Sequence, residues 1–150
     1  MAVAVAVAVA ACSAGEHASN PFADFARAHV TLTSSAGSHT ITAWIADTPA
    51  RRERGLMFVH VLPPEAGMIF FFETPRYVSM WMKNTFIALD LLFIDEGGRI
   101  VNIARDARPM SLDIIDSAAP VVAVLELPAG TAERLSLQAG DHVSYTQANH

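Results

Sequence analysis

Residues 79–90 read Ser-Met-Trp-Met-Lys-Asn-Thr-Phe-Ile-Ala-Leu-Asp, and the rest of the chain is organised around them. The stretch places a polar Lys-Asn-Thr step and a carboxylate inside mostly apolar chain. Because an unpaired buried polar group costs about 1–3 kcal/mol, these groups must find partners. The stretch therefore forms either the most constrained part of a core or the floor of a binding site.

Short runs of apolar or β-branched residues lie on both sides of this stretch and predict β-strands. Residues 34–38 and 95–98 are rich in turn formers and predict two hairpins. Residues 73–76 are expected to form a turn, and residues 107–119 a loop without a clean period. The predicted strands are residues 29–33, 40–46, 67–72, 77–82, 89–94, 99–104, 121–127 and 142–146.

Two short helices are predicted between these strands. Thr48 suits an N-cap and Pro49 the first helical position, and Gly55 ends that helix. Thr131 begins a second helix that runs to about Leu137. No long helix alternates with the strands, which disfavours a doubly wound parallel sheet. The expected fold is mainly β, an antiparallel sandwich or small barrel with two short helices.

Composition excludes several classes of function. The chain has 150 residues, the size of one ordinary domain, and 52% of them are hydrophobic. The net charge of −5 and the scattered basic residues argue against a nucleic-acid partner. No apolar run is long enough for a membrane-spanning helix. No phosphate loop or dinucleotide-binding motif occurs, so no cofactor is expected. We expect a monomer.

The first twenty residues differ from the rest and are interpreted as a signal-like segment with a tether, followed by one domain over residues 21–150. Residues 1–11 form an uncharged Ala/Val run, and residues 9–12, Val-Ala-Ala-Cys, resemble the lipobox of bacterial lipoproteins. That resemblance implies lipidation of Cys12. Export to the periplasm is expected, with possible membrane attachment through Cys12. An ordinary cleaved signal peptide or a low-complexity extension is the alternative.

A series of motifs, in order over roughly residues 40–146, resembles the DUF192 family. The resemblance implies a compact, mainly β domain with a jelly-roll-like or barrel-like topology, which is often found in exported bacterial proteins and has no assigned function. Ala88 departs from the family, which usually has Pro at this position. The motifs are Arg54-Gly-Leu-Met-Phe58, Gly67-Met-Ile-Phe70, Trp81-Met-Lys-Asn-Thr85, Leu89-Asp90, Phe93-Ile-Asp95, Val124-Leu-Glu-Leu-Pro-Ala-Gly130 and Gly140-Asp141.

The polar residues in these segments predict a binding surface. A Trp face stacks on a ring, and Lys or Asn side chains fix polar groups of a ligand. The first hypothesis is therefore an exported domain that binds a small polar ligand or a cell-envelope partner. The alternative is a buried Trp and a turn whose side chains bond to backbone. The candidate ligand-binding residues are Arg54, Trp81, Lys83, Asn84, Thr85, Asp90 and Glu126.

Asp90 and Glu126 are the candidates for catalysis. Each stands in an apolar strand, where a carboxylate needs a cation, donors or a proton. Arg54 is the natural partner of Asp90, and Lys83 or an Arg could pair with Glu126. If the two carboxylates share a cleft, they suit general acid–base chemistry, so an envelope-acting hydrolase is a second hypothesis. Two structural ion pairs are the blander interpretation.

Methionines supply a third hypothesis. Strand alternation puts Met80 and Met82 on the same side, and Met57 lies in a neighbouring motif. Thioethers are soft ligands that select Cu(I), so these three residues are weak candidates for a copper site in an exported protein. Filling of the core is the commoner role of Met. The histidines are dispersed and show no metal-ligand spacing.

Overall fold

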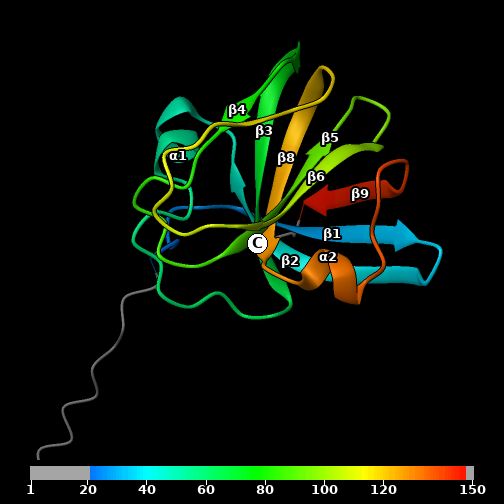
Figure 1. Cartoon of the computed structure of the whole chain (residues 1–150), viewed down its shortest axis with the longest axis horizontal. Coiled ribbons are helices and arrows are strands. Elements are labelled where there is room, and N and C mark those ends of the chain that lie inside the picture. The colour runs from blue at the N-terminus through cyan, green and yellow to red at the C-terminus, as the bar shows by residue number, and fades with distance from the viewer. Residues whose placement is uncertain (1–20, 148–150) are drawn as a thin grey trace, which may run out of the picture.

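The computed structural model describes residues 21–147 and shows a curled β-sheet with two short helices (Figure 1). The main sheet has seven strands in the order β6-β5-β8-β3-β2-β1-β9, and β4 and β7 form a second, two-stranded sheet. The elements are β1 (Arg27–Ser34), β2 (Gly37–Ala46), α1 (Pro49–Arg54), β3 (Ala66–Arg76), β4 (Ser79–Met80), β5 (Leu89–Ile94), β6 (Ile100–Ala107), β7 (Ile115–Asp116), β8 (Val121–Pro128), α2 (Thr131–Arg134) and β9 (His142–Gln147).

The mainly β class with two short helices is confirmed. The sheet is not closed into a barrel, and its form is sandwich-like. All neighbouring strands of the main sheet pair antiparallel except β2 and β3, which are parallel. The parallel pair is possible because α1 and the loop after it carry the chain back to the start of β3.

Helix α1 forms as its sequence predicts. The Thr48 hydroxyl accepts a hydrogen bond from the Arg51 backbone N–H at 3.2 Å, and Pro49 occupies the first turn. Gly55 ends the helix with a φ of 46°, a conformation that favours glycine. The six-residue length follows from these two signals.

Three predicted boundaries are wrong. Residues 73–76, expected as a turn, continue β3 to Arg76, which pairs with Val121 beyond a bulge. The strand expected over residues 77–82 shortens to β4, whose partner β7 lies within the predicted loop. Helix α2 ends at Arg134 rather than near Leu137. For the two strands a tertiary partner decides the length, which local propensity does not reveal, whereas α2 ends in a local turn in which Ser136 has a φ of 54°.

Two hydrophobic clusters cover the two faces of the sheet. In β5, Leu91 and Phe93 belong to one cluster, whereas Leu92 and Ile94 belong to the other. The first cluster also includes apolar residues from the loops around α1, and the second packs both halves of the curled sheet together. Strands β5 and β8 are therefore buried on both faces. In the described part of the chain, no helix is long and apolar enough to cross a membrane.

Candidate functional site: a cavity around Glu126

Glu126 lies on β8, a central strand between β5 and β3. Its neighbours across the two ladders are Leu91 and Met68, which belong to the first cluster. The residue is only 4% exposed. Gly67 allows β3 to approach this point, because a Cβ there would lie 2.7 Å from the Glu126 backbone oxygen. Alternation along β8 thus points a carboxyl group into an apolar layer.

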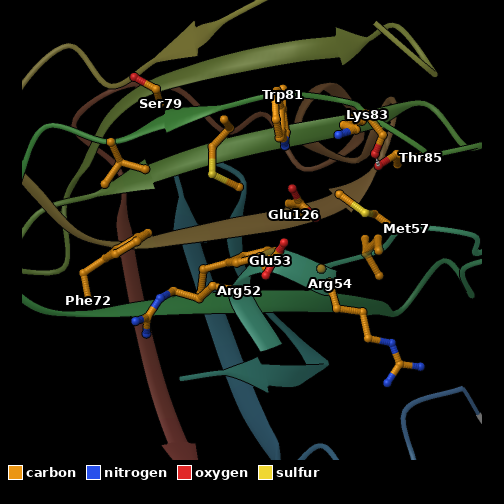
Figure 2. Close-up of a pocket in the computed structure, with 15 residues that line it drawn as sticks. Arg52, Glu53, Arg54, Met57, Phe72, Ser79, Trp81, Lys83, Thr85 and Glu126 are labelled. Atoms are coloured by element: carbon orange, nitrogen blue, oxygen red, sulfur yellow. Dashed lines mark hydrogen bonds between the residues drawn. The ribbon is translucent and has the colours of Figure 1, made fainter. Parts of the chain in front are cut away.

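A cavity of about 280 Å³ opens above this carboxyl group, with Glu126 at its floor (Figure 2). Its walls come from α1, from the three residues after it, from β3 and from residues 78–85, so it joins segments far apart in the sequence. The lining combines aromatic rings, thioethers and a few polar groups. It includes Arg52, Glu53, Arg54, Met57, Phe70, Phe72, Ser79, Met80, Trp81, Lys83, Thr85 and Glu126.

The Glu126 carboxyl group has no hydrogen-bond or ion-pair partner among residues 21–147. Its oxygens face the cavity and are not sealed in the core, since no fully buried side-chain polar atom of these residues lacks a partner. The expectation that Lys83 or an Arg pairs with it is therefore wrong. Burial raises the pKa of the Glu126 carboxyl group from 4.5 to about 8, because the charged form loses its hydration. At neutral pH the group is mostly protonated, so it can both donate and accept one hydrogen bond.

Trp81 and Lys83 form one rim of the cavity. Trp81 is 47% exposed, and the Lys83 ammonium lies 5.1 Å from the centroid of its ring. This is cation–π distance. No carboxylate within the described residues pairs with Lys83. The rim therefore presents an indole ring and an ammonium group that a bound molecule can reach.

The two arginines that line the cavity direct their charge elsewhere. Arg52 donates hydrogen bonds to the carbonyl oxygens of Asp47 and Phe71, each at 2.8 Å. Arg54 donates to the Pro21 carbonyl and forms an ion pair with Asp24, and Figure 2 shows its guanidinium turned away from Glu126. The cavity consequently keeps an acidic floor without a guanidinium partner.

Asn84 and Thr85 shape the loop that carries the rim. Asn84 has a φ of 55°, and its side-chain amide donates to the Met57 sulfur at 3.9 Å. The Thr85 hydroxyl donates to the Lys83 carbonyl at 3.3 Å. Thr85 lines the cavity, whereas Asn84 lines a shallower hollow beside it that also includes Trp81. These residues hold the rim in place.

Asp90 lies on the opposite face of the sheet from Glu126. Register pairs Asp90 with Leu127, so strand alternation separates its side chain from that of Glu126. Its two oxygens accept hydrogen bonds from the backbone N–H groups of Asp106, at 2.9 Å, and Ala132, at 2.8 Å. Arg54 is therefore not its partner. A hydrolase that uses Asp90 and Glu126 in one cleft is excluded, because the sheet separates the two carboxyl groups.

The three candidate copper ligands do not all lie in the cavity. Met57 and Met80 both line the cavity, but Met82 is 1% exposed and belongs to the first cluster. Strand β4 ends at Met80, so the alternation expected over residues 77–82 does not continue to Met82. The expected lipidation site, Cys12, lies outside the described residues.

Sequence reasoning missed part of the lining. Glu53 is the second carboxylate beside the cavity, and Arg52, Phe72 and Ser79 complete the walls. The helix that carries Glu53 was predicted correctly. Which of its faces meets β8 depends on the parallel pairing of β2 and β3, and no local signal reveals that pairing.

Comparison with known proteins now identifies the family. The model of the DUF192 family, described as "Uncharacterized ACR", matches residues 30–145. The chain belongs to the DUF192 family. No curated protein matches the chain.

Two crystal structures share the fold of this DUF192 chain. A protein from Sinorhizobium meliloti 1021, provisionally named a transcription regulator, is 44% identical, with a TM-score of 0.78. The match covers 81% of this chain and 95% of that one. A protein of unknown function from Novosphingobium aromaticivorans DSM 12444 is 40% identical, with a TM-score of 0.76 over 77% of this chain and 83% of that one.

Proposed function

We propose that this DUF192 protein is an exported binding protein whose cavity holds a small molecule with an uncharged polar group and a ring-shaped or apolar body. The observation that carries the proposal is the Glu126 carboxyl group, which is buried at the floor of a cavity and has no partner in the described chain. The carboxyl group faces the cavity and has no bond to the protein, so it is free to form a hydrogen bond with a ligand.

The walls support the same class of ligand. Trp81, Met57 and Met80 offer polarisable surface to a flat or apolar body. Glu126 in its protonated form donates to a carbonyl or hydroxyl oxygen of the ligand, and Lys83 can donate to a second oxygen at the rim. Sugars of the cell envelope and their derivatives combine these features. The Ala/Val run and the Cys12 motif support export to the periplasm.

A ligand screen tests the proposal. Thermal unfolding and Trp fluorescence of the full chain are measured with N-acetylglucosamine, muramyl peptides and nucleotides. A ligand that binds only the folded state raises the melting temperature by mass action. We expect a hit to be weakened by Trp81→Leu, and to fade above pH 8 in the wild type as Glu126 ionises and can no longer donate.

The controls separate binding from folding. Glu126→Gln keeps a donor at the floor and should retain binding at high pH, where the wild type loses it. Tyr145→Ser removes an exposed ring on β9, away from the cavity, and should change nothing. If a folded wild type responds to none of these compounds, or if Trp81→Leu binds a hit as well as the wild type does, the proposal is wrong.

Cu(I) binding is a second candidate, because Met57 and Met80 line the same cavity as Trp81 and Glu126 (Figure 2). Two thioethers and an adjacent carboxyl group form a soft, partly apolar donor set. Competition with a Cu(I)-specific chromophore should show weaker binding by Met57→Leu and Met80→Leu. Met82→Leu is the matched control, since Met82 lies in the core. Equal Cu(I) affinity in all three variants would contradict this candidate.

The Sinorhizobium protein is provisionally named a transcription regulator, but the basic residues of this chain do not favour DNA binding. The densest basic cluster is Arg51, Arg52 and Arg54 on α1. Arg51 pairs with Asp47, and the other two guanidinium groups donate to backbone carbonyls. Cations already engaged by protein groups are poorly available to phosphates, and the net charge of −5 repels nucleic acid. We propose no nucleic-acid partner.

A further inference from the structure

Three loops at one end of the domain carry most of its exposed apolar side chains. The loops are residues 57–62, 81–88 and 108–114, which together are called the loop patch here. Of the nine large hydrophobic residues that are exposed in the described chain, seven lie on these loops. They are Phe58, Val61, Trp81, Phe86, Met110, Leu112 and Ile114.

Backbone hydrogen bonds join the three loops into one surface. The Phe58 N–H donates to the Asn84 carbonyl at 2.8 Å. The Met110 N–H donates to the Thr85 carbonyl, and the Met82 N–H donates to the Ser111 carbonyl, both at 3.0 Å. The rings of Phe58 and Phe86 lie 5.9 Å apart in an edge-to-face arrangement. The exposed side chains are therefore neighbours on a fixed platform.

Each loop also holds one non-glycine residue in the left-handed region. The φ angles are 64° at Phe58, 55° at Asn84 and 62° at Met110. Bulky residues rarely adopt this conformation, and it costs conformational free energy. The exposure of Phe58 and Met110 gives no core packing in return. Because the fold holds these side chains outward despite this cost, we infer that their exposure serves a function.

We propose that the loop patch rests in the interfacial layer of an anionic lipid membrane. Trp and Phe side chains next to Lys and Arg are typical of protein surfaces that lie at the headgroup level of a membrane. On these loops Arg108 forms an ion pair with Asp113, and Lys83 is left without an ion-pair partner in the described chain, so the loops carry a net charge of +1 although the whole chain carries −5. A locally basic surface on an acidic protein complements anionic headgroups.

The point at which the chain enters the domain supports this occupant. The described chain begins at Pro21, whose carbonyl accepts a hydrogen bond from Arg54. Arg54 lines the same hollow as Phe58 and Trp81. The preceding sequence contains the uncharged Ala/Val run of residues 1–11 and Cys12. An attachment in that segment would bring the loop patch, and not the opposite end of the sheet, to the lipid surface.

Trp81 is the reporter in the experiment that tests the proposal. The full chain carries Trp44→Phe, so that Trp81 is the single Trp. Vesicles of equimolar phosphatidylcholine and phosphatidylglycerol are added, with pure phosphatidylcholine vesicles as the comparison. We expect a blue shift of Trp81 emission and co-sedimentation with the anionic vesicles, and weaker binding to the neutral ones.

Matched variants locate the contact. Val61→Ser, Leu112→Ser and Ile114→Ser combined should weaken partitioning by about tenfold or more, since each removes apolar area from the contact. Leu112→Ser alone serves if the triple variant does not fold. Tyr145→Ser removes an exposed ring outside the loop patch and should partition like its parent.

Three results would overturn the proposal. The first is the absence of any Trp81 shift with anionic vesicles. The second is co-sedimentation that the triple variant retains in full, which would assign membrane binding to residues 1–20. The third is a Trp81 shift that depends on protein concentration without vesicles, together with a dimer in sedimentation, which would assign the loop patch to a second copy of the chain.

Discussion

Asp90 and Glu126 lie on neighbouring strands and are both buried, but they differ in their hydrogen-bond partners. Asp90 is 1% exposed and accepts two backbone hydrogen bonds, one of them from the first turn of α2. Glu126 is 4% exposed and has no partner in the described chain. Burial alone therefore does not distinguish a structural carboxylate from a functional one.

The difference arises from the face of the sheet. Asp90 points to the side where α2 and the β6 backbone supply N–H groups, so its charge is matched by fixed dipoles. Glu126 points to the side where α1 and the loops leave a cavity. Asp90 fastens a helix to the sheet, whereas Glu126 makes no bond to the described protein and faces the cavity.

The largest effect is expected from removal of the structural carboxylate. Asp90→Ala leaves the buried N–H group of Ala132 and the partly buried N–H group of Asp106 without their acceptor, and should lower the free energy of unfolding by about 3 kcal/mol. Asp90→Asn keeps one acceptor oxygen and should lose about half as much. Urea denaturation monitored by circular dichroism measures both. If Asp90→Ala unfolds at the wild-type midpoint, the carboxylate does not fasten α2 to the sheet.

An effect of opposite sign, smaller per pH unit, is expected at Glu126, where replacing the carboxyl group should stabilise the folded state at high pH. Its pKa is about 8 in the folded protein and 4.5 when exposed, so the folded state binds the proton more tightly. The protonated Glu126 carboxyl group contributes fully to the stability of the fold below pH 4.5. This contribution is lost as the pH rises through 8. Wild type should therefore lose up to about 1.4 kcal/mol per pH unit relative to Glu126→Gln within this window.

Urea midpoints of both proteins across this pH range give the measurement. The comparison with Glu126→Gln cancels the other titrating groups, which the two proteins share. Parallel stability curves from pH 5 to 8 would show that Glu126 is not held protonated, and the contrast with Asp90 would disappear.

The sequence predicts one half of this contrast well. The nearly continuous apolar runs of residues 89–94 and 121–127 predict that both carboxylates lie in buried strands, and the DUF192 motifs mark both. Their separation depends on the register that pairs Asp90 with Leu127 and Leu91 with Glu126. A shift of one residue would place both on the same face. Register is a property of two strands together, and single-chain patterns do not contain it.

The cavity is harder to predict than the strands. Arg54, Trp81, Lys83, Thr85, Met57, Met80 and Glu126 were candidates, and the structure places all of them on one lining. Glu53 and Phe72 could not be found, because they reach the cavity only through the tertiary arrangement that places α1, β3 and β8 around it. The Thr48 cap and Gly55 predict the helix but carry no information about its orientation.

The smallest effect is expected at Lys83, and it tests the cause of the Glu126 shift. Burial alone raises the pKa of the Glu126 carboxyl group. If no cation contributes, Lys83→Met should move the titration midpoint of Glu126 by about half a pH unit or less, as expected for a weak, solvent-screened charge. Carboxyl carbon NMR shifts across pH 5 to 10 measure it, with Glu126→Gln to assign the signal. A clear rise of the midpoint in Lys83→Met would show that the ammonium group stabilises the carboxylate. Glu126 would then resemble Asp90, a buried carboxylate with a partner inside the protein, and the argument for an external ligand would lose its basis.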